Sequence, residues 1–364
     1  MRKCLAFLLV LCFLTMPVFA QPQTDAPQML HEAAAGICTL LGTDDPLADE
    51  RLLPAGDSSG DWIALTFALA GEEAAFVKYA KRLETYVTET YARNGGLGAY
   101  SATQGQRIIL AASALGLDPT AFGGTIDLIA DSIYNYRQDD EEIDDQGLNA
   151  CIFALLALDC RHYSVPRGSR YTRYGLIERL LANQKEDGSF GLTKGSADAD
   201  ITAMAVQALA VYRSNAAVND AAQRALDWLS EQQGAGGRFS SGASETIAQT
   251  IIAVTAMGLD PQTEPRFIKS GITLSDVLEK YRLPDGSFAH ELADGEGNVL
   301  ATQQAMLALL AIEKQKDGVR LYDFSDFAPP KDTQHPWVWI VISAGAAAGI
   351  AAVVWMIRRK RHHG

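Results

Sequence analysis

Two aspartates stand one residue apart at the start of a nearly uncharged stretch. Asp198 and Asp200 open the sequence SADADITAMAVQALAVY, which covers residues 196–212. A carboxylic acid that is held protonated can donate a proton to a substrate. An aspartate at the start of a helix can instead accept hydrogen bonds from free backbone N–H groups. We therefore predict that Asp198 and Asp200 start a helix as capping residues, and we take Asp200, Asp198 and Glu245 as the candidate acid groups of the alternative, catalytic role.

Amide side chains occur one turn inside otherwise apolar helices. Gln249, Gln303 and Gln304 are the examples, and an amide that is buried alone is costly. They either hydrogen-bond to neighbouring helices or contact a guest in a central cavity. On the second interpretation the ligand-binding residues are Asp200, Glu245, Gln249, Gln146 and Gln303.

Cysteine and histidine do not form a metal-site pattern in this chain. Cys38, Cys151 and Cys160 follow the N-terminal segment, and the last two lie nine residues apart on one expected helix, too far apart to pair with each other. Pairing of Cys38 with either one stays open. No spacing resembles that of a zinc site, so we expect neither a metal nor a cofactor.

The chemistry-bearing residues sit within a repeat. DGSF begins at residues 187 and 285, with GGRF at 236 between them, and each follows an amphipathic helix. An alanine-rich helix that is apolar nearly all round comes after each turn. Six such segments begin at Thr66, Ile109, Ile152, Val206, Ile251 and Met306. We predict an all-α protein, an α6/α6 toroid of six helical hairpins whose inner helices present their N-termini at one mouth.

The repeat resembles that of the prenyltransferase and squalene cyclase superfamily, over roughly residues 28–327. The segments that carry the match are DADITAMAVQALAVY, ALDWLSEQQ, ETIAQTIIAVTAMGLDP, LPDGSFAH, ATQQAMLALLA and LYDFSDF. The resemblance is strongest to single-toroid bacterial surface proteins, which are similar to the helical domain of intrinsic factor and transcobalamin. It implies an α/α toroid, and the relation to the last two proteins implies a corrinoid as guest.

The same resemblance implies a different activity for the aspartates. Cyclases of the squalene–hopene type protonate an alkene with the middle aspartate of Asp-x-Asp-Asp. Asp200 matches this proton donor, but Ile201 replaces the next carboxylate. Those cyclases also line their cavity with aromatic side chains that stabilise carbocations. The inner helices here carry few of them: Trp62, Phe67, Phe153 and Tyr212.

The two ends of the chain are predicted to be targeting segments. Residues 1–20 resemble a secretory signal peptide. Residues 336–357 are uncharged and long enough to span a bilayer, and the basic residues 358–364 follow. We expect a single-pass protein of the cell membrane, with domain 21–327 outside, linker 328–335 and a cytoplasmic tail.

The chain is acidic, with 44 Asp and Glu against 31 Lys and Arg and a net charge of −13. This balance argues against binding to nucleic acid. Our main prediction is a membrane-anchored, extracytoplasmic toroid that binds a small molecule or another surface protein, without catalysis. The first alternative is a terpenoid-cyclase- or prenyltransferase-like enzyme that acts on a prenyl or other lipid substrate through Asp200. The second alternative is a structural or protein-interaction module.

Overall fold

The computed structural model describes residues 26–98, 102–137, 142–145 and 147–330, and this part of the chain is helical. Six of its helices form an inner layer: α2 (Ser58–Ala70), α4 (Ala102–Leu115), α5 (Asn149–Asp159), α7 (Ala199–Leu209), α9 (Ser244–Ala256) and α11 (Val299–Lys316). The outer layer consists of α1 (Ala26–Leu41), α3 (Phe76–Asn94), the π-helical turn η1 (Ala130–Tyr134), α6 (Arg173–Asn183), α8 (Ala216–Glu231) and α10 (Leu274–Glu279). Two short turns are η2 (Ala210–Tyr212) and η3 (Pro265–Phe267).

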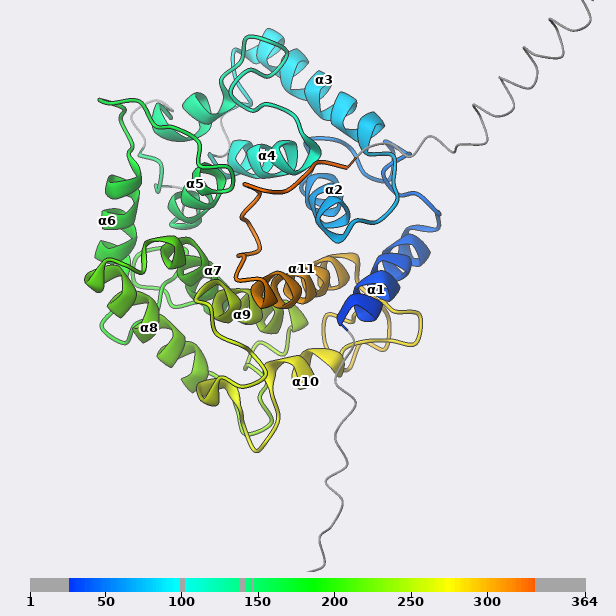
Figure 1. The fold of residues 1–364 in the computed structure, drawn as a ribbon, viewed down its shortest axis with the longest axis vertical. Helices are drawn as coiled ribbons and strands as arrows, with labels where there is room; N and C mark the ends of the chain where they lie inside the picture. The colour runs from blue at the N-terminus through cyan, green and yellow to red at the C-terminus, as the bar shows by residue number, and fades with distance from the viewer. Residues whose placement is uncertain (1–25, 99–101, 138–141, 146, 331–364) are drawn as a thin grey trace, which may run out of the picture.

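The inner helices close into a ring. Each one contacts the next along the chain, and α11 returns to contact α2, as Figure 1 shows. Outer and inner elements alternate along the chain, so every inner helix starts from the same end of the ring. We call that end the N-terminal mouth. The predicted all-α toroid is confirmed.

Hydrophobic periodicity explains the two layers. On α8, Val218, Ala222, Leu226 and Leu229 form the buried stripe that packs on the inner layer. The inner helix α9 is instead buried on all sides, from Ser244 to Ala256. Small side chains allow six such helices to approach one axis.

The repeated turns fix the start of the inner helices. In the DGSF turn, the Asp187 carboxylate accepts hydrogen bonds from the Ser189 backbone N–H (3.0 Å) and hydroxyl (2.7 Å). Gly188 has a φ of 91°, and a Cβ there would lie 2.6 Å from a backbone oxygen of α8. Phe190 then donates its N–H to the Thr202 hydroxyl at 2.9 Å, which ties the turn to α7.

The predicted signal peptide, membrane segment and basic tail lie outside the described residues, as does most of the linker. Among the helices that the structure does describe, none is long and apolar enough to cross a membrane.

Candidate active site

Asp198 is the N-cap of α7. Its Oδ1 accepts the backbone N–H of Ile201 at 2.9 Å, while its own N–H donates to the Phe190 carbonyl at 2.9 Å. Asn298 is the equivalent N-cap of α11, where its Oδ1 accepts the N–H of Ala301 at 3.0 Å. The Asp198 side chain therefore serves the helix start, as an N-cap does in general.

Asp200 has a different environment. It is the second residue of α7, beyond the cap, and its Oδ1 is buried without a hydrogen-bond partner among the described residues. Burial raises the pKa of Asp200, and the carboxylates of Asp198 and Glu245 raise it further, whereas an interaction with the Thr246 hydroxyl opposes them. A raised pKa extends the pH range in which the carboxylic acid keeps its proton, and the protonated acid is the form a proton donor needs.

Glu245 lies beside Asp200 as the second residue of α9. His290 places Nδ1 2.9 Å from its Oε2, and the negative charge of Glu245 raises the pKa of His290. The backbone fixes this pair, because Ser244 donates its N–H to the His290 carbonyl at 2.9 Å. The pairing of His290 with Glu245 was not predicted from the sequence. The available signal was the repeat, because His290 stands two residues after Phe288 just as Leu192 stands two residues after Phe190.

The glutamines connect neighbouring inner helices. Gln207 of α7 donates to the Gln249 side chain of α9 at 2.8 Å, and Gln249 donates to Gln304 of α11. Gln249 thereby links α9 to both α7 and α11. Gln303 donates to the Thr66 hydroxyl at 2.8 Å, across the closure between α11 and α2. Gln146 lies outside the described residues.

Aromatic rings bridge the interior of the ring. The Trp62 and Phe153 rings lie 5.9 Å apart, although α4 separates their helices, so they meet in the lumen. The Tyr322 ring also lies close to Trp62, at 6.4 Å between ring centroids. Of the other inner-helix aromatics, Phe67 is buried, and Tyr212 donates to Asp159 at 2.6 Å near the far end of α7.

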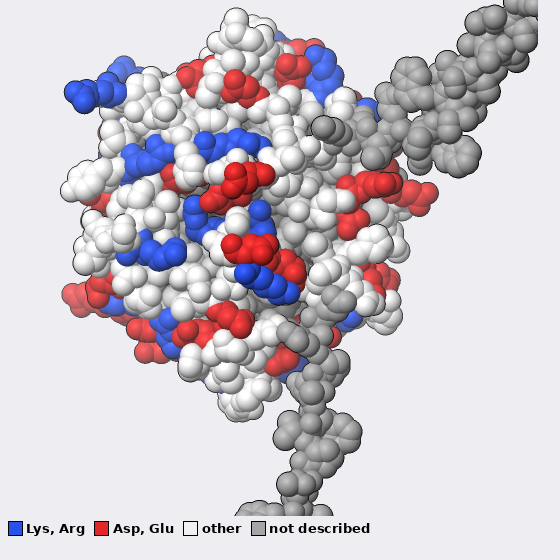
Figure 2. Space-filling view, in the orientation of Figure 1, with Lys and Arg blue, Asp and Glu red and all other residues white. Residues whose placement is uncertain are grey.

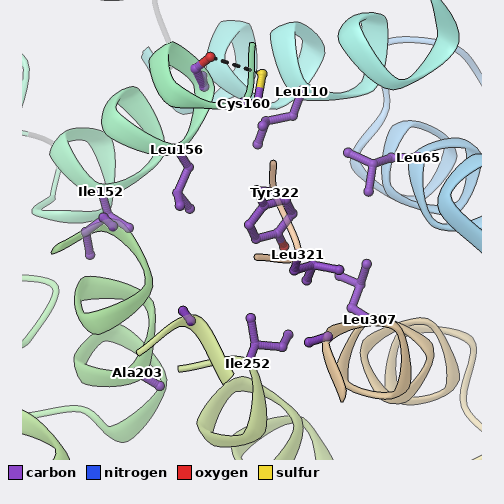
Figure 3. Close-up of a cluster of buried hydrophobic side chains, with 14 of the residues drawn as sticks. Leu65, Leu110, Ile152, Leu156, Cys160, Ala203, Ile252, Leu307, Leu321 and Tyr322 are labelled. Atoms are coloured by element: carbon purple, nitrogen blue, oxygen red, sulfur yellow. Dashed lines mark hydrogen bonds between the residues drawn. The ribbon is translucent and has the colours of Figure 1, made fainter. Parts of the chain in front are cut away.

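Tyr322 belongs to residues 317–330, which we call the C-terminal segment. This segment follows α11 and crosses the centre of the ring in Figure 1. Figure 3 shows the Tyr322 ring inside the lumen, surrounded by Leu65, Leu110, Leu156, Ile252, Leu307 and Leu321. LYDFSDF carries part of the family resemblance, but its position in the lumen was not predicted, because nothing local to a non-helical segment indicates what it packs against.

Backbone hydrogen bonds hold the C-terminal segment in place. Phe324 donates its N–H to the Cys160 carbonyl at 2.7 Å, and the Arg161 guanidinium donates to the Phe327 carbonyl at 3.2 Å. Figure 2 views the ring from the same side, where basic and acidic side chains are interspersed. The lumen is thus closed from the end opposite the N-terminal mouth.

Other chemistry-bearing groups lie apart from Asp200. Within the described ranges, no group of three or more His, Cys, Asp and Glu side chains could hold a metal ion. Cys38, Cys151 and Cys160 are free thiols, and burial raises the pKa of Cys151 and of Cys160 to about 12. A cavity of about 890 Å³ lies between α1 and the end of α2, lined in part by His31, Phe67 and Glu72.

Neither a protein-family model nor a curated protein matches this chain. Among solved structures, the type II terpene cyclase MstE from Scytonema matches. A variant of MstE in complex with geranylgeranyl dihydroxybenzoate (substrate) gives a TM-score of 0.53 at 12% identity, over 80% of this chain and 99% of that one. MstE without ligand gives a TM-score of 0.52 at 12% identity, with the same coverage of both chains.

The chain has the α/α-toroid fold. At this identity the likeness shows the toroid and nothing finer. The predicted α/α-toroid fold is confirmed at that level.

The prediction of a non-catalytic, ligand-binding toroid with a corrinoid as guest is wrong. The two MstE structures are those of an enzyme, one of them with its substrate, which favours the enzyme alternative. The centre of the ring is occupied by Tyr322 and Leu321 of the toroid itself. The preference against an enzyme is not supported.

Proposed function

We propose that this toroid is an acid-catalysed enzyme in which Asp200 protonates a carbon–carbon double bond of a neutral isoprenoid lipid. The observation that carries the proposal is the Asp200 carboxyl group, buried with no partner for Oδ1 and with its pKa raised. It lies at the mouth of a lumen that holds the half-buried rings of Trp62 and Phe153. Such rings stabilise a carbocation through their electron-rich faces.

The charge at the mouth argues for a neutral substrate. Asp198 and Glu245 flank Asp200, and Glu291 and Asp294 lie close to His290. This set of carboxylates disfavours a diphosphate group, whose charge has the same sign. A terpenoid alcohol, quinol or hydrocarbon avoids that repulsion.

Exposed leucines at the same end suit a lipid. Leu300 in the first turn of α11 is 55% exposed. Leu192 and Leu292 are each 41% exposed, in the connections that lead into α7 and α11. Large apolar side chains near one opening offer a contact surface for a hydrocarbon chain.

The reaction balances without a redox partner. The Asp200 carboxyl gives its proton to one alkene carbon, and the cation forms at the other carbon. Loss of a proton from a carbon next to the cation to water at the mouth gives an isomerised product. Where a second double bond of the chain attacks the cation first, a ring closes and the cation moves to the far carbon of that double bond. Loss of a proton beside it to water then gives a cyclised product. Water then returns a proton to the Asp200 carboxylate.

The test compares two isosteric variants of neighbouring residues. D200N is expected to lower turnover of geraniol, farnesol, geranylgeraniol or geranylgeranyl dihydroxybenzoate at least about 100-fold, the typical contribution of a positioned acid. D198N keeps a capping side chain, as Asn298 shows, and should retain turnover within a few-fold. Products are measured by gas or liquid chromatography with mass spectrometry. Equal activity of D200N and the unmodified protein would overturn the proposal.

We also propose that residues 336–357, outside the described range, anchor the toroid in a membrane. Their uncharged composition and the following basic cluster support this assignment. Alkaline carbonate extraction of membranes should leave the full chain in the pellet and release a chain that ends at residue 330. Release of the full chain would contradict the anchor.

A further inference from the structure

The lumen is bridged a short distance below the acid group. Asp200 is the second residue of α7, whereas Trp62 and Phe153 are each the fifth residue of their helices. Three residues correspond to about 5 Å at a rise of about 1.5 Å per residue. This difference along the helices is about the length of one isoprene unit.

Tyr322 supports this bridge from below. Its ring is 7% exposed and contacts the Trp62 indole, and its hydroxyl makes no hydrogen bond within the described part of the chain. Aliphatic side chains of the inner helices surround it, among them Leu65, Leu110 and Ile252. An indole that rests on this ring cannot tilt further into the lumen.

Resting on the proposed function, we infer that Tyr322 determines substrate specificity: it forms the floor that limits how much hydrocarbon enters beside Asp200. The C-terminal segment then restricts the reaction to the terminal isoprene unit of a chain. Protonation of that unit favours isomerisation over cyclisation, because the remaining double bonds stay outside the lumen and do not reach the cation.

Removal of the Tyr322 ring should lengthen the site. In Y322A the vacated volume is apolar, since leucine and isoleucine side chains line it. Trp62 can then move downward and admit further isoprene units. Y322F is the matched control, because it keeps the ring and removes only a hydroxyl that has no partner.

Binding is measured in the D200N background of the full chain, so that turnover does not affect the measured dissociation constants. Isothermal titration with geraniol and geranylgeraniol gives the ratio of their dissociation constants. We expect D200N/Y322A to change this ratio at least tenfold in favour of geranylgeraniol, and D200N/Y322F to leave it unchanged. The same ratio in all three proteins would overturn the inference. If Y322A does not fold, Y322L keeps a buried aliphatic side chain and carries the same expectation.

The two proposals fail separately. A changed binding ratio with unchanged turnover in D200N would remove Asp200 as the acid and keep Tyr322 as the floor. A loss of turnover in D200N with an unchanged ratio would keep the acid and remove the floor.

Discussion

Asp198 and Asn298 occupy the same place in two copies of the repeat, and each accepts the backbone N–H three residues further on, at 2.9 and 3.0 Å. The threonines that follow them, Thr202 and Thr302, also match, since each accepts the N–H of the turn phenylalanine at 2.9 Å. The position of Asp200 is filled by Leu300 in the second copy. The repeat therefore requires a cap at the first position but no carboxylate at the second.

The role of Asp198 as an N-cap predicts that D198A loses more stability than D198N. D198A should lower the free energy of unfolding by about 1 kcal/mol, because it leaves a backbone N–H of α7 without its partner. D198N should change it by no more than a few tenths of that amount, as Asn298 caps α11. Urea denaturation followed by circular dichroism measures both. Equal losses in the two variants would contradict the role as a cap.

The raised pKa of Asp200 predicts a pH-dependent effect of D200N. Below the unfolded-state pKa of about 3.9, both states of the unmodified protein hold the proton. Because the pKa of Asp200 is higher in the folded state, proton binding at Asp200 stabilises the folded unmodified protein. This stabilisation is lost as pH rises through the folded-state pKa, whereas D200N does not titrate. The unfolding free energy of D200N relative to the unmodified protein should therefore increase between pH 4 and pH 7.5. A difference that does not depend on pH would contradict a raised pKa.

The negative charge of Glu245 beside Asp200 leads us to expect that its removal shifts the pH profile of the proposed reaction. Its negative charge helps to raise the pKa of Asp200, so E245Q should lower that pKa. The decline of kcat/KM toward high pH should then begin at lower pH. H290A removes the cation that faces Glu245 and should move the decline in the opposite direction. Shifts of the same sign in both variants would exclude an electrostatic role for this pair.

The buried ion pair between α2 and α4 predicts a large loss of stability. Asp61 is fully buried, and its Oδ2 lies 3.0 Å from Arg107 Nε. R107M leaves this carboxylate without its cation and should lower the unfolding free energy by about 3–5 kcal/mol. K81M breaks the exposed pair between Lys81 and Glu84 and should have no measurable effect. A loss below about 1 kcal/mol in R107M would contradict the assignment.

The sequence by itself determined the helical layers, the repeat and the capping role of Asp198. Each of these depends on residues within one repeat: the apolar stripe of α8, the glycine of the DGSF turn and the aspartate before α7. Contacts of this kind follow from local spacing.

Only the tertiary structure decided what fills the ring and which groups face Asp200. Tyr322 meets Trp62, and His290 meets Glu245, because ring closure brings segments together that are far apart in the sequence. No periodicity encodes such a meeting. The contact of Tyr322 with Trp62 fills the centre of the ring, and the contact of His290 with Glu245 gives Asp200 its charged surroundings. Both are therefore visible only in the folded chain.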